Sequence, residues 1–527
     1  MPKVFNVTGL CVPEQNYMVD LTDRVHLIIS EYICKNKYFT INRARQYGKT
    51  TLLYCLEKEL KENYIVVSLS FEAADEYFQS AYTLAEGLTL DIADCLRLQG
   101  VSENIIEAWC RPVSERFPMR DLGKKITELC RSCEKGIILM IDEVDKSSDN
   151  QIFLSFLGLL RAKYLDQLKK KDETFQSVIL AGVYDIRNLK LKLHPHQEPK
   201  YNSPWNIAAD FRLDMNFSRQ EIASMLTEYE NDRCTGMDIS HISHLIYEYT
   251  SGYPYLVSKI CQLTEEQITG TKLFPDRKRA WSREGISAAE MLLRKESNSL
   301  FDDLVKKLAD YPELKRMLRE MLFSGSLFPF DRDNHLTQLG ATLGFLKEEK
   351  GYIVIQNRIF ETRLYDFFLS EEALNNAVYR QALTERNQFV DEGVLNMKLV
   401  MEKFCQHFTE VYGDNDARFV EEEGRKLFLL YLKPIINGTG NYYIEAQTRN
   451  LKRTDIIVDY LGQQYIIELK IWHGEEYNRK GEIQLSDYLE IYGLSTGYLL
   501  SFSFNKKKQT GMREIVLDGK RIFEMVV

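Results

Sequence analysis

Hydrophobic and polar positions in the first part of the chain alternate between short apolar runs and longer amphipathic stretches. Five apolar runs have the length and composition of buried strands, and segments of helical period separate them. These runs are Tyr38–Asn42, Tyr64–Ser70, Gly136–Asp142, Ser177–Ala181 and Phe211–Phe217. Strands that alternate with helices form parallel βαβ units, so we expect a doubly wound α/β domain over residues 1–217.

From residue 218 the pattern becomes helical. Ser218 and Glu221 have the spacing of a capping box, which predicts a helix that begins directly after the fifth strand. Ser251-Gly-Tyr-Pro ends one helix and starts the next, and we assign residues 218–294 to a helical lid. Residues 295–370 continue as helices and close on a short strand at Gly351-Tyr-Ile-Val-Ile-Gln, which suggests a winged-helix domain.

Beyond residue 370 the pattern changes twice. Residues 371–400 are charged and helical and predict a linker, and residues 401–527 return to an α/β pattern. We find no internal repeat. At 527 residues and roughly 150 residues per domain, the chain has room for three or four domains.

A Gly-Lys-Thr triplet follows the first predicted strand and precedes a helical run at residues 50–60. Its glycine lets the backbone approach an anion, its lysine reaches the β- and γ-phosphates of a nucleotide, and its threonine ligates Mg²⁺. The carboxyl edge of a parallel sheet is where such a ligand binds. The predicted nucleotide-binding residues are Arg45, Gln46, Tyr47, Gly48, Lys49, Thr50 and Thr51.

The third predicted strand ends in two acids, Asp142 and Glu143. Each charge at the end of a buried apolar strand needs a partner. We expect Asp142 to bind Mg²⁺, directly or through water, and Glu143 to polarise the attacking water. An ordinary strand end is the structural alternative.

Four stretches together resemble the AAA-like members of the P-loop superfamily, which includes archaeal-type ATPases and the signal-transduction ATPases with numerous domains. They span about residues 15–370, and they are Arg43-Ala-Arg-Gln-Tyr-Gly-Lys-Thr-Thr, Met140-Ile-Asp-Glu-Val-Asp, Ser203-Pro-Trp-Asn-Ile-Ala and Ser251-Gly-Tyr-Pro. The resemblance implies a domain that binds and hydrolyses ATP, with a nucleotide-sensing lid and a winged helix. Arg43 stands where the family has the first glycine of its phosphate loop.

The same resemblance implies a basic sensor residue after the fourth strand, in contact with the γ-phosphate. Arg187, in Ala181-Gly-Val-Tyr-Asp-Ile-Arg, is our candidate for this role. Arg212 is a second candidate, and a solvated surface arginine is the alternative.

A second candidate site lies some four hundred residues later. Two apolar runs flank Leu461-Gly462 and predict a β-hairpin. With the turn at these two residues, Asp455 and Glu468 are cross-strand neighbours, and alternation places Lys470 on the face of Glu468. The carboxylates can hold Mg²⁺, and the lysine can stabilise developing charge on phosphorus or orient water. A polar sheet edge with a salt bridge is the alternative.

The spacing Asp-x(12)-Glu-x-Lys resembles the core of the PD-(D/E)XK nucleases, over roughly residues 401–527, although Thr454 replaces the proline of the motif. The resemblance implies catalytic roles for Asp455, Glu468 and Lys470. A helix before the hairpin contains Glu423, which shares a face with Leu427 and Leu430, so we expect it to point inward as a metal ligand.

Two further residues complete this candidate site. Gln484, in the helix after the hairpin, is placed to face the metal as a catalytic residue. Glu445, on an earlier strand, is an additional candidate ligand.

Composition narrows the class of protein. The net charge of −9 is not typical of a nucleic-acid-binding chain, although a local basic face still permits DNA contact. Ten scattered cysteines indicate reduced thiols, and the pair Cys130 and Cys133 is better explained by a buried helical face than by a metal knuckle. We see no membrane span and no signal peptide, and therefore expect a cytoplasmic protein.

The sequence thus predicts an α/β protein with a P-loop sheet, a helical lid, a winged helix and a separate nuclease-like domain. We expect ATP and Mg²⁺ as cofactors and nucleic acid, DNA in the first place, as partner. ATP hydrolysis would control cleavage in either direction, and other ATPase–nuclease fusions suggest bacterial defence or mobile-element biology. The alternative is a non-cleaving, ATP-dependent regulator that binds DNA or a protein through its winged helix. The chain could also form a homo-oligomer through its ATPase domain, and a protein could act as its trigger.

Overall fold

The structure is a computed structural model, and its description covers thirteen stretches of the chain. These are residues 2–144, 151–183, 205–296, 298–324, 326–331, 333–373, 376–412, 421–436, 440–444, 455–461, 463–471, 475–503 and 510–527. The chain divides into two compact units. The first comprises Met1–Cys234, Gly252–Gln262 and Gln338–Gly344, and the second comprises Thr235–Ser251, Leu263–Thr337 and Phe345–Val527. The predicted domain boundaries remain predictions.

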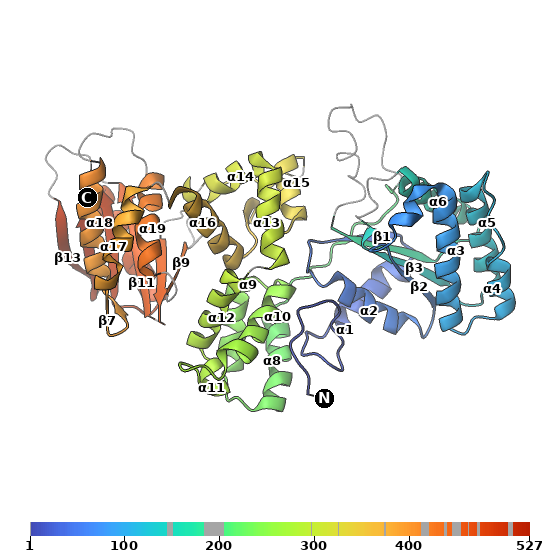
Figure 1. The fold of residues 1–527 in the computed structure, drawn as a ribbon, viewed down its shortest axis with the longest axis horizontal. Helices are drawn as coiled ribbons and strands as arrows, with labels where there is room; N and C mark the ends of the chain where they lie inside the picture. Colours follow the sequence, from blue (N-terminus) through green and yellow to red (C-terminus); the bar gives the residue numbers. More distant parts are fainter. Residues whose placement is uncertain are drawn as a thin grey trace. The chain divides into compact units, whose positions relative to one another are not determined.

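A four-stranded parallel sheet forms the centre of the first unit (Figure 1). Its strands are β1 (Phe39–Asn42), β2 (Ile65–Ser70), β3 (Ile137–Asp142) and β4 (Ser177–Gly182), in the order β1-β4-β3-β2. All residues of β3 and β4 are buried, as expected for strands covered on both faces. The four corresponding sequence predictions are confirmed.

The prediction of a fifth strand at Phe211–Phe217 is wrong. A single parallel bridge between Phe39 and Ala209 takes its place beside β1. Side chains hold the carbonyl groups of the segment that follows. Arg43 donates to the carbonyl of Leu213 at 2.8 Å, and Arg24 donates to that of Asn216 at 2.7 Å. Because arginines satisfy these acceptors, the segment does not need a neighbouring strand.

Besides the sheet, the described residues of the first unit form α-helices. They are α1 (Thr22–Ile28), α2 (Lys49–Leu60), α3 (Ala81–Leu98), α4 (Glu103–Trp109), α5 (Pro118–Ser132), α6 (Gln151–Leu168), α8 (Arg219–Arg233) and α10 (Pro254–Leu263). One buried cluster joins β2, β3 and β4 to α3, α5 and α6 through residues such as Leu88, Ile126, Leu139 and Phe156. This core fixes the carboxyl ends of the strands, where the nucleotide site is expected.

The start of the predicted lid has the expected local structure. Ser218 accepts a hydrogen bond from the backbone of Glu221, and the Glu221 side chain returns one to the backbone of Ser218, so the capping box is confirmed. Ser251 and Gly252 then adopt left-handed backbone conformations, which end α9 (Ile239–Thr250) before α10 begins at Pro254. The predicted helix break is confirmed.

The second unit begins with helices and a short hairpin. Besides α9, its elements are α11 (Arg277–Ala280), α12 (Arg283–Lys295), α13 (Ser299–Asp310), α14 (Pro312–Arg319), α15 (His335–Thr342, shared with the first unit), β5 (Leu346–Glu349), β6 (Tyr352–Ile355) and α16 (Arg358–Ala373). The predicted strand near Gly351 is β6, which pairs antiparallel with β5. The winged-helix assignment of this region stays a prediction.

Next along the chain come α17 (Ala377–Glu385), β7 (Val390–Asp391), β8 (Val394–Leu395), α18 (Met397–Tyr412) and α19 (Glu421–Ile436). Helix α17 packs against α19 and buries Val378 and Ala382. The segment expected to be a linker therefore contributes to the packing of this unit.

A six-stranded mixed sheet completes the second unit. Its strands are β9 (Gly440–Ile444), β10 (Asp455–Tyr460), β11 (Gln463–Ile471), β12 (Thr496–Phe502), β13 (Gly511–Leu517) and β14 (Lys520–Val526), in the order β13-β14-β12-β11-β10-β9. The pairs β11–β12 and β12–β14 are parallel, and the other pairs are antiparallel. Helix α20 (Glu475–Ile491) connects β11 to β12. This region confirms the predicted return to α/β structure.

The two faces of this sheet bury different helices. Leu485 and Leu489 of α20 pack with Ile466 of β11 and Leu499 of β12 on one face. Helices α18 and α19 lie on the other face (Figure 1). There Phe502 contacts aromatic side chains of α18, and a Cβ on Gly424 of α19 would touch its ring. Residues at odd and even positions of a strand therefore face different helices.

Among the described residues, no helix has both the length and the low polarity that crossing a bilayer requires.

We predict that Gly252→Ala destabilises the protein more than Gly236→Ala does. Both glycines have φ near +75°, where an added Cβ is expected to cost about 1–2 kcal/mol. Only at Gly252 would the Cβ also lie 2.0 Å from a backbone atom, the carbonyl oxygen of Phe217. Thermal unfolding of the two variants measures the difference, and equal midpoints would contradict the close approach at Gly252.

Candidate functional site

The phosphate loop connects β1 to α2 and ends at Gly48, the N-cap of that helix. Gly48 has φ +75°, and no side chain caps the helix. The first amide groups of α2 have no partner within the helix and add the positive end of its dipole. A Cβ at Gly48 would lie 3.9 Å from Pro254, which places the predicted Gly-Tyr-Pro element next to the loop. The loop thus offers an anion site of backbone donors.

Lys49 supplies a cation inside this loop. Its side chain is buried, with 7% of the residue exposed. The ammonium group donates to the carbonyl groups of Arg43 and Ala44, each at 3.0 Å. The charge is thereby held at the centre of the loop, where phosphate oxygens would replace or join these carbonyl acceptors.

Thr50 and Asp142 bring α2 and β3 together. The Thr50 hydroxyl donates to the Asp142 carboxylate at 2.7 Å, and Asp142 is 8% exposed. Two neighbouring ligands of an octahedral Mg²⁺ with bonds of 2.0–2.1 Å lie about 2.9 Å apart. The spacing and the hard oxygen chemistry of this pair therefore fit the predicted magnesium site.

Glu143 follows Asp142 in a strained turn. Its φ is +57°, and its backbone amide donates to the Asp142 carboxylate at 2.9 Å. A non-glycine residue in this conformation persists only where its surroundings enforce it, and functional sites are where such residues concentrate. The turn takes the Glu143 side chain out of the buried strand, and the residue is half-buried.

Arg43, which replaces a family glycine, does not fill the loop. Its guanidinium donates to the carbonyl groups of Asn42 and Leu213, and it lies 5.4 Å from the centre of the Phe211 ring. Burial lowers the pKa of this guanidinium. The side chain therefore reaches the segment that precedes α8, while only its carbonyl faces Lys49.

Two other predicted loop residues link the loop to distant parts of the first unit. The Tyr47 hydroxyl donates to Asn216 at 2.7 Å, and burial raises the pKa of Tyr47 to about 12. Its ring packs edge-on against Tyr253, with the ring centres 4.5 Å apart. The Tyr253 hydroxyl in turn donates to the carbonyl of Arg45 at 2.6 Å, while the Arg45 residue is exposed.

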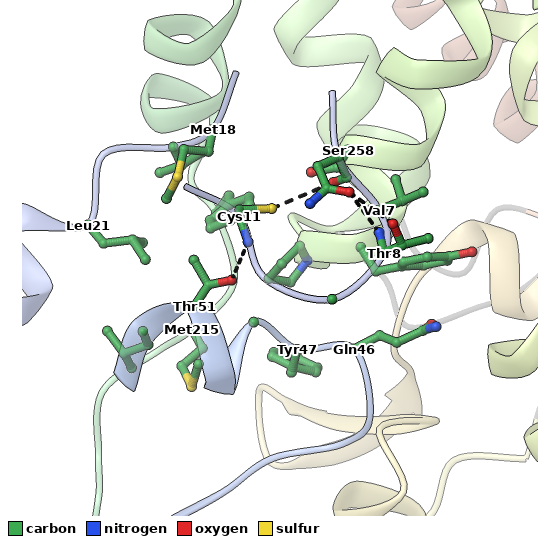
Figure 2. Close-up of a pocket in the computed structure, with 18 of the residues that line it drawn as sticks. Val7, Thr8, Cys11, Met18, Leu21, Gln46, Tyr47, Thr51, Met215 and Ser258 are labelled. Atoms are coloured by element: carbon green, nitrogen blue, oxygen red, sulfur yellow. Dashed lines mark hydrogen bonds between the residues drawn. The ribbon is translucent and has the colours of Figure 1, made fainter. Parts of the chain in front are cut away.

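A cavity of about 390 Å³ adjoins the loop (Figure 2). Its lining is mainly apolar and comes from the N-terminal segment, the phosphate loop, the segment before α8 and the start of α10. Gln46 contributes from the loop and Thr51 from the first turn of α2, and Thr51 accepts a hydrogen bond from the backbone of Cys11. Sequence analysis missed the N-terminal part, because residues such as Val7 and Met18 belong to no motif.

Of the two predicted sensor residues, only Arg212 lies in the part of the chain that is described. Arg187 lies outside the described residues. Arg212 is exposed and pairs with Asp210 at 3.4 Å.

The second predicted site lies on the hairpin formed by β10 and β11. The register pairs Asp455 with Glu468, which confirms that they are cross-strand neighbours. Glu468 is 0% exposed and Lys470 is 6% exposed. The Lys470 ammonium lies 2.7 Å from a Glu468 carboxylate oxygen, so the two residues form a buried ion pair.

Helix α20 covers this ion pair. A Cβ on Gly481 would lie 3.4 Å from the Lys470 side chain, so the helix passes directly over the lysine. Gln484, one turn further along α20, is half-buried. The predicted helix after the hairpin is therefore present, on the sheet face that carries Glu468.

Glu423 does not point inward, and this corrects the sequence-based expectation. The residue is exposed. Its helix, α19, packs against the sheet face of Phe502, whereas Glu468 is on the face that α20 covers. Leu427 and Leu430 are buried as predicted, whereas Glu423, in the first turn of α19, is exposed although the next residue, Gly424, packs on Phe502 of the sheet. Glu445 lies outside the described residues.

Sequence analysis missed a second buried carboxylate on the same face. Glu524 is 0% exposed and stands in one cross-strand row with Leu499 and Glu468. It accepts a hydrogen bond from Ser501 at 2.8 Å and an ion-pair contact from Arg513. Burial, and then the nearby charge of Glu524, raises the pKa of Glu482 on α20. The sequence does carry a signal for Glu524, because a charged residue interrupts an apolar strand there, as it does at Glu468.

Metal binding by Asp455, Glu468 and Glu423 stays a prediction. Among the described residues, no group of three or more His, Cys, Asp or Glu side chains is arranged to hold a metal ion. Cys130, in α5, and Cys133, directly after the end of α5, are half-buried and pack against the core of the first unit. Burial raises the pKa of Cys130 to about 12.

Comparisons with known proteins match the first part of the chain. A curated relative, an uncharacterized WD repeat-containing protein of Synechocystis, is 22% identical over 353 residues. These residues are 64% of this chain but only 28% of the relative's length. A Walker-type ATPase of Pyrococcus abyssi covers 68% of this chain and 99% of its own, at 14% identity and a TM-score of 0.43. The ORC2 protein of Aeropyrum pernix covers 68% and 97%, at 13% identity and a TM-score of 0.39.

The family comparison is decisive. Residues 24–368 match the family model of the AAA-like domain, which agrees with the resemblance seen over about residues 15–370. This chain therefore belongs to the AAA-like family, and its phosphate loop is that of a P-loop ATPase domain.

Proposed function

We propose that the chain is an ATP-driven switch that controls a Mg²⁺-dependent nuclease site in residues 401–527. The ATPase part of this proposal rests on the hydrogen bond of Thr50 with Asp142, close to the buried Lys49. The nuclease part rests on the buried ion pair of Glu468 with Lys470, and on the cross-strand pairing of Glu468 with Asp455.

In the ATPase site, each residue has a role that its position supports. Lys49 and the amide groups at the start of α2 neutralise the β- and γ-phosphates. Thr50 and Asp142 would hold Mg²⁺, which shields the charge of the phosphates. Glu143, in the turn beyond Asp142, accepts a hydrogen bond from water and orients it for attack. The adjoining apolar cavity suits the base of the nucleotide.

The contacts of the loop suggest how nucleotide occupancy is transmitted. Arg43 bonds to Leu213, Tyr47 bonds to Asn216, and the carbonyl of Arg45 binds Tyr253. These partners lie directly before α8 and α10. A change in loop conformation on ATP binding therefore shifts the start of both helices, which is the differential contact that a switch requires.

In the nuclease-like site, Asp455 and Glu468 would hold Mg²⁺, which supplies a polarised water as nucleophile. Lys470 neutralises charge that develops on the phosphate, and Gln484 on α20 adds a polar group from the same side. The helices that the nuclease resemblance calls for, before and after the hairpin, are present as α19 and α20. Nucleic acid, DNA first, is the proposed substrate.

One observation favours a second candidate function, that of a non-cleaving regulator. Glu468 is fully buried and already paired with Lys470. A paired buried charge can fix a fold without taking part in chemistry. In this alternative, ATP sets the conformation of a module that binds DNA or a protein partner.

We expect Lys49→Ala to weaken ATP binding at least tenfold, because the phosphates lose their buried cation. Titration of a fluorescent ATP analogue measures the affinity. The matched control is Lys58→Ala on the same helix, whose exposed ammonium pairs with Glu14. If Lys49→Ala bound the ATP analogue with wild-type affinity, the loop would not be the ATP-binding site.

Glu143→Gln should retain ATP binding and lose roughly 100-fold in hydrolysis rate, since a general base contributes at least that much. The amide keeps the size of the side chain but cannot accept the proton of water. Phosphate release under saturating ATP is the measurement, with the exposed Glu103→Gln as control. An unchanged rate would assign the activation of water to another residue.

The double variant Glu468→Gln, Lys470→Met should abolish nucleic-acid cleavage and leave ATP binding intact. Changing both partners together avoids leaving one buried charge alone. The assay incubates the pure protein with single- and double-stranded DNA and RNA, with and without Mg²⁺ and ATP. Lys480→Ala, an exposed lysine of α20, is the control.

The same assay separates the two candidate functions. Cleavage by wild type that the double variant lacks supports the nuclease, and a difference between wild type and Lys49→Ala with ATP supports the switch. Equal cleavage by the double variant contradicts the assigned site. Absence of cleavage by the wild type on every substrate supports the regulator.

A further inference from the structure

A pocket of about 350 Å³ lies within the second unit, among α12, α13, α16, α19 and β9. Four cationic side chains line it, Arg294, Lys295, Arg363 and Lys433, against the single carboxylate of Asp366. We propose that this pocket binds a small phosphate-bearing anion, no larger than a nucleoside monophosphate. The proposal goes beyond the proposed function and does not depend on it.

The charges of the pocket do not balance. Asp366 faces two of the cations, since Arg294 lies at 3.1 Å and Lys433 at 3.4 Å from its carboxylate. Glu290 on α12 compensates part of the Arg294 charge from outside the pocket, at 2.6 Å. Four cations and these two carboxylates leave an excess of two positive charges. Arg363 is half-buried, and a half-buried cation without a carboxylate partner is unfavourable until a counter-ion binds, whereas the charge of the exposed Lys295 is solvated.

The excess charge is carried by Arg363 and Lys295. Within the described part of the chain, neither has a carboxylate at ion-pair distance. Arg363 instead donates to the carbonyl of Arg294 at 2.7 Å, and its guanidinium lies over the Phe301 ring at 5.3 Å from the ring centre. These contacts hold the guanidinium at the pocket wall, while Lys295 is exposed at the end of α12.

The other cations are fixed in place as well. The Arg294 side chain is nearly buried and makes two ion pairs, and these raise its pKa against the effect of desolvation. Lys433 also donates to the backbone carbonyl of Asp366 at 3.0 Å. An anion would therefore meet donors whose rotamers are already fixed, which reduces the entropy that binding costs.

The chemistry of this wall selects phosphate. Guanidinium groups present paired N–H donors that match the oxygens of a phosphate, and a dianion matches the charge excess. The volume is at the lower end of small-molecule sites. Met291, Val305 and Phe367 provide an apolar side for the rest of the ligand. A duplex is too large to enter.

The position of the pocket gives the ligand a regulatory role. Arg294 and Arg363 belong to the AAA-like domain, which ends at residue 368, whereas Lys433 and Tyr442 belong to the elements that follow it. A bound anion would contact both parts through one set of charges. It is therefore a second chemical input, separate from the phosphate loop.

The test uses the full chain with the substitution Lys49→Ala, so that the phosphate loop does not compete. Inorganic phosphate, pyrophosphate and AMP are titrated separately by calorimetry, and a 12-nucleotide single-stranded DNA is titrated in parallel. We expect one of the three small probes to bind with one site per chain. Lys295→Glu and Arg363→Gln should each weaken it at least tenfold, and the exposed Lys278→Glu should leave it unchanged.

Lys295 is exposed, so its variant tests the pocket even if Arg363→Gln does not fold. Binding of inorganic phosphate and AMP with equal affinity assigns the site to phosphate alone, and tighter binding of AMP assigns it to a nucleotide. Absence of binding by all three small probes overturns the proposal. So does binding that survives Lys295→Glu unchanged, or binding of DNA alone that this variant removes.

Discussion

The hydrogen bond between Thr50 and Asp142 is the contact on which the nucleotide site depends, because it joins the helix after β1 to the end of β3. In the sheet order, β4 separates these two strands, so neither residue is brought to the other by strand pairing. Only the common carboxyl edge of a parallel sheet, with a helix that starts there, places the two oxygens side by side. The buried core of β3 and β4 fixes that edge, so the packing of apolar residues determines the geometry of a polar site.

The replacement of a glycine by Arg43 changes what the phosphate loop is attached to. A glycine there could not make the side-chain contacts that Arg43 makes with the segment before α8. The arginine instead holds the carbonyl of Leu213, and Tyr47 holds Asn216 in the same segment. This segment lacks a strand partner for most of its length, so its position follows the side chains that bind it. The phosphate loop is thus bonded to the segment that leads into α8.

The sequence-based predictions were correct for features that depend on neighbouring residues alone. Four strands, the Ser218 capping box, the Gly252 break and the pairing of Asp455 with Glu468 each follow from a periodicity or a turn within a few residues. Predictions failed where the outcome depended on distant partners. Phe211–Phe217 has strand composition, but Arg24 and Arg43 take its carbonyl groups. Glu423 has the spacing of a buried face, but it lies in the first turn of α19 and is exposed. The apolar cavity was missed because its lining comes from segments far apart in the sequence, whereas Glu524 had the local signal of a charged residue within an apolar strand.

The two candidate sites differ in how their charges are stabilised. In the phosphate loop, the cation is held by neutral carbonyl groups, and an incoming phosphate replaces weak acceptors with a strong one. In the C-terminal sheet, Glu468 and Glu524 are each buried with a cation already beside them. Apolar residues of the same size would usually stabilise such a sheet at least as well as paired charges do. Two paired carboxylates in one row, on the face that α20 covers, are therefore hard to explain by stability alone. Chemistry at Glu468 requires α20 to shift or the Lys470 contact to open, and that opening is the step on which a switch in the AAA-like domain would have to act.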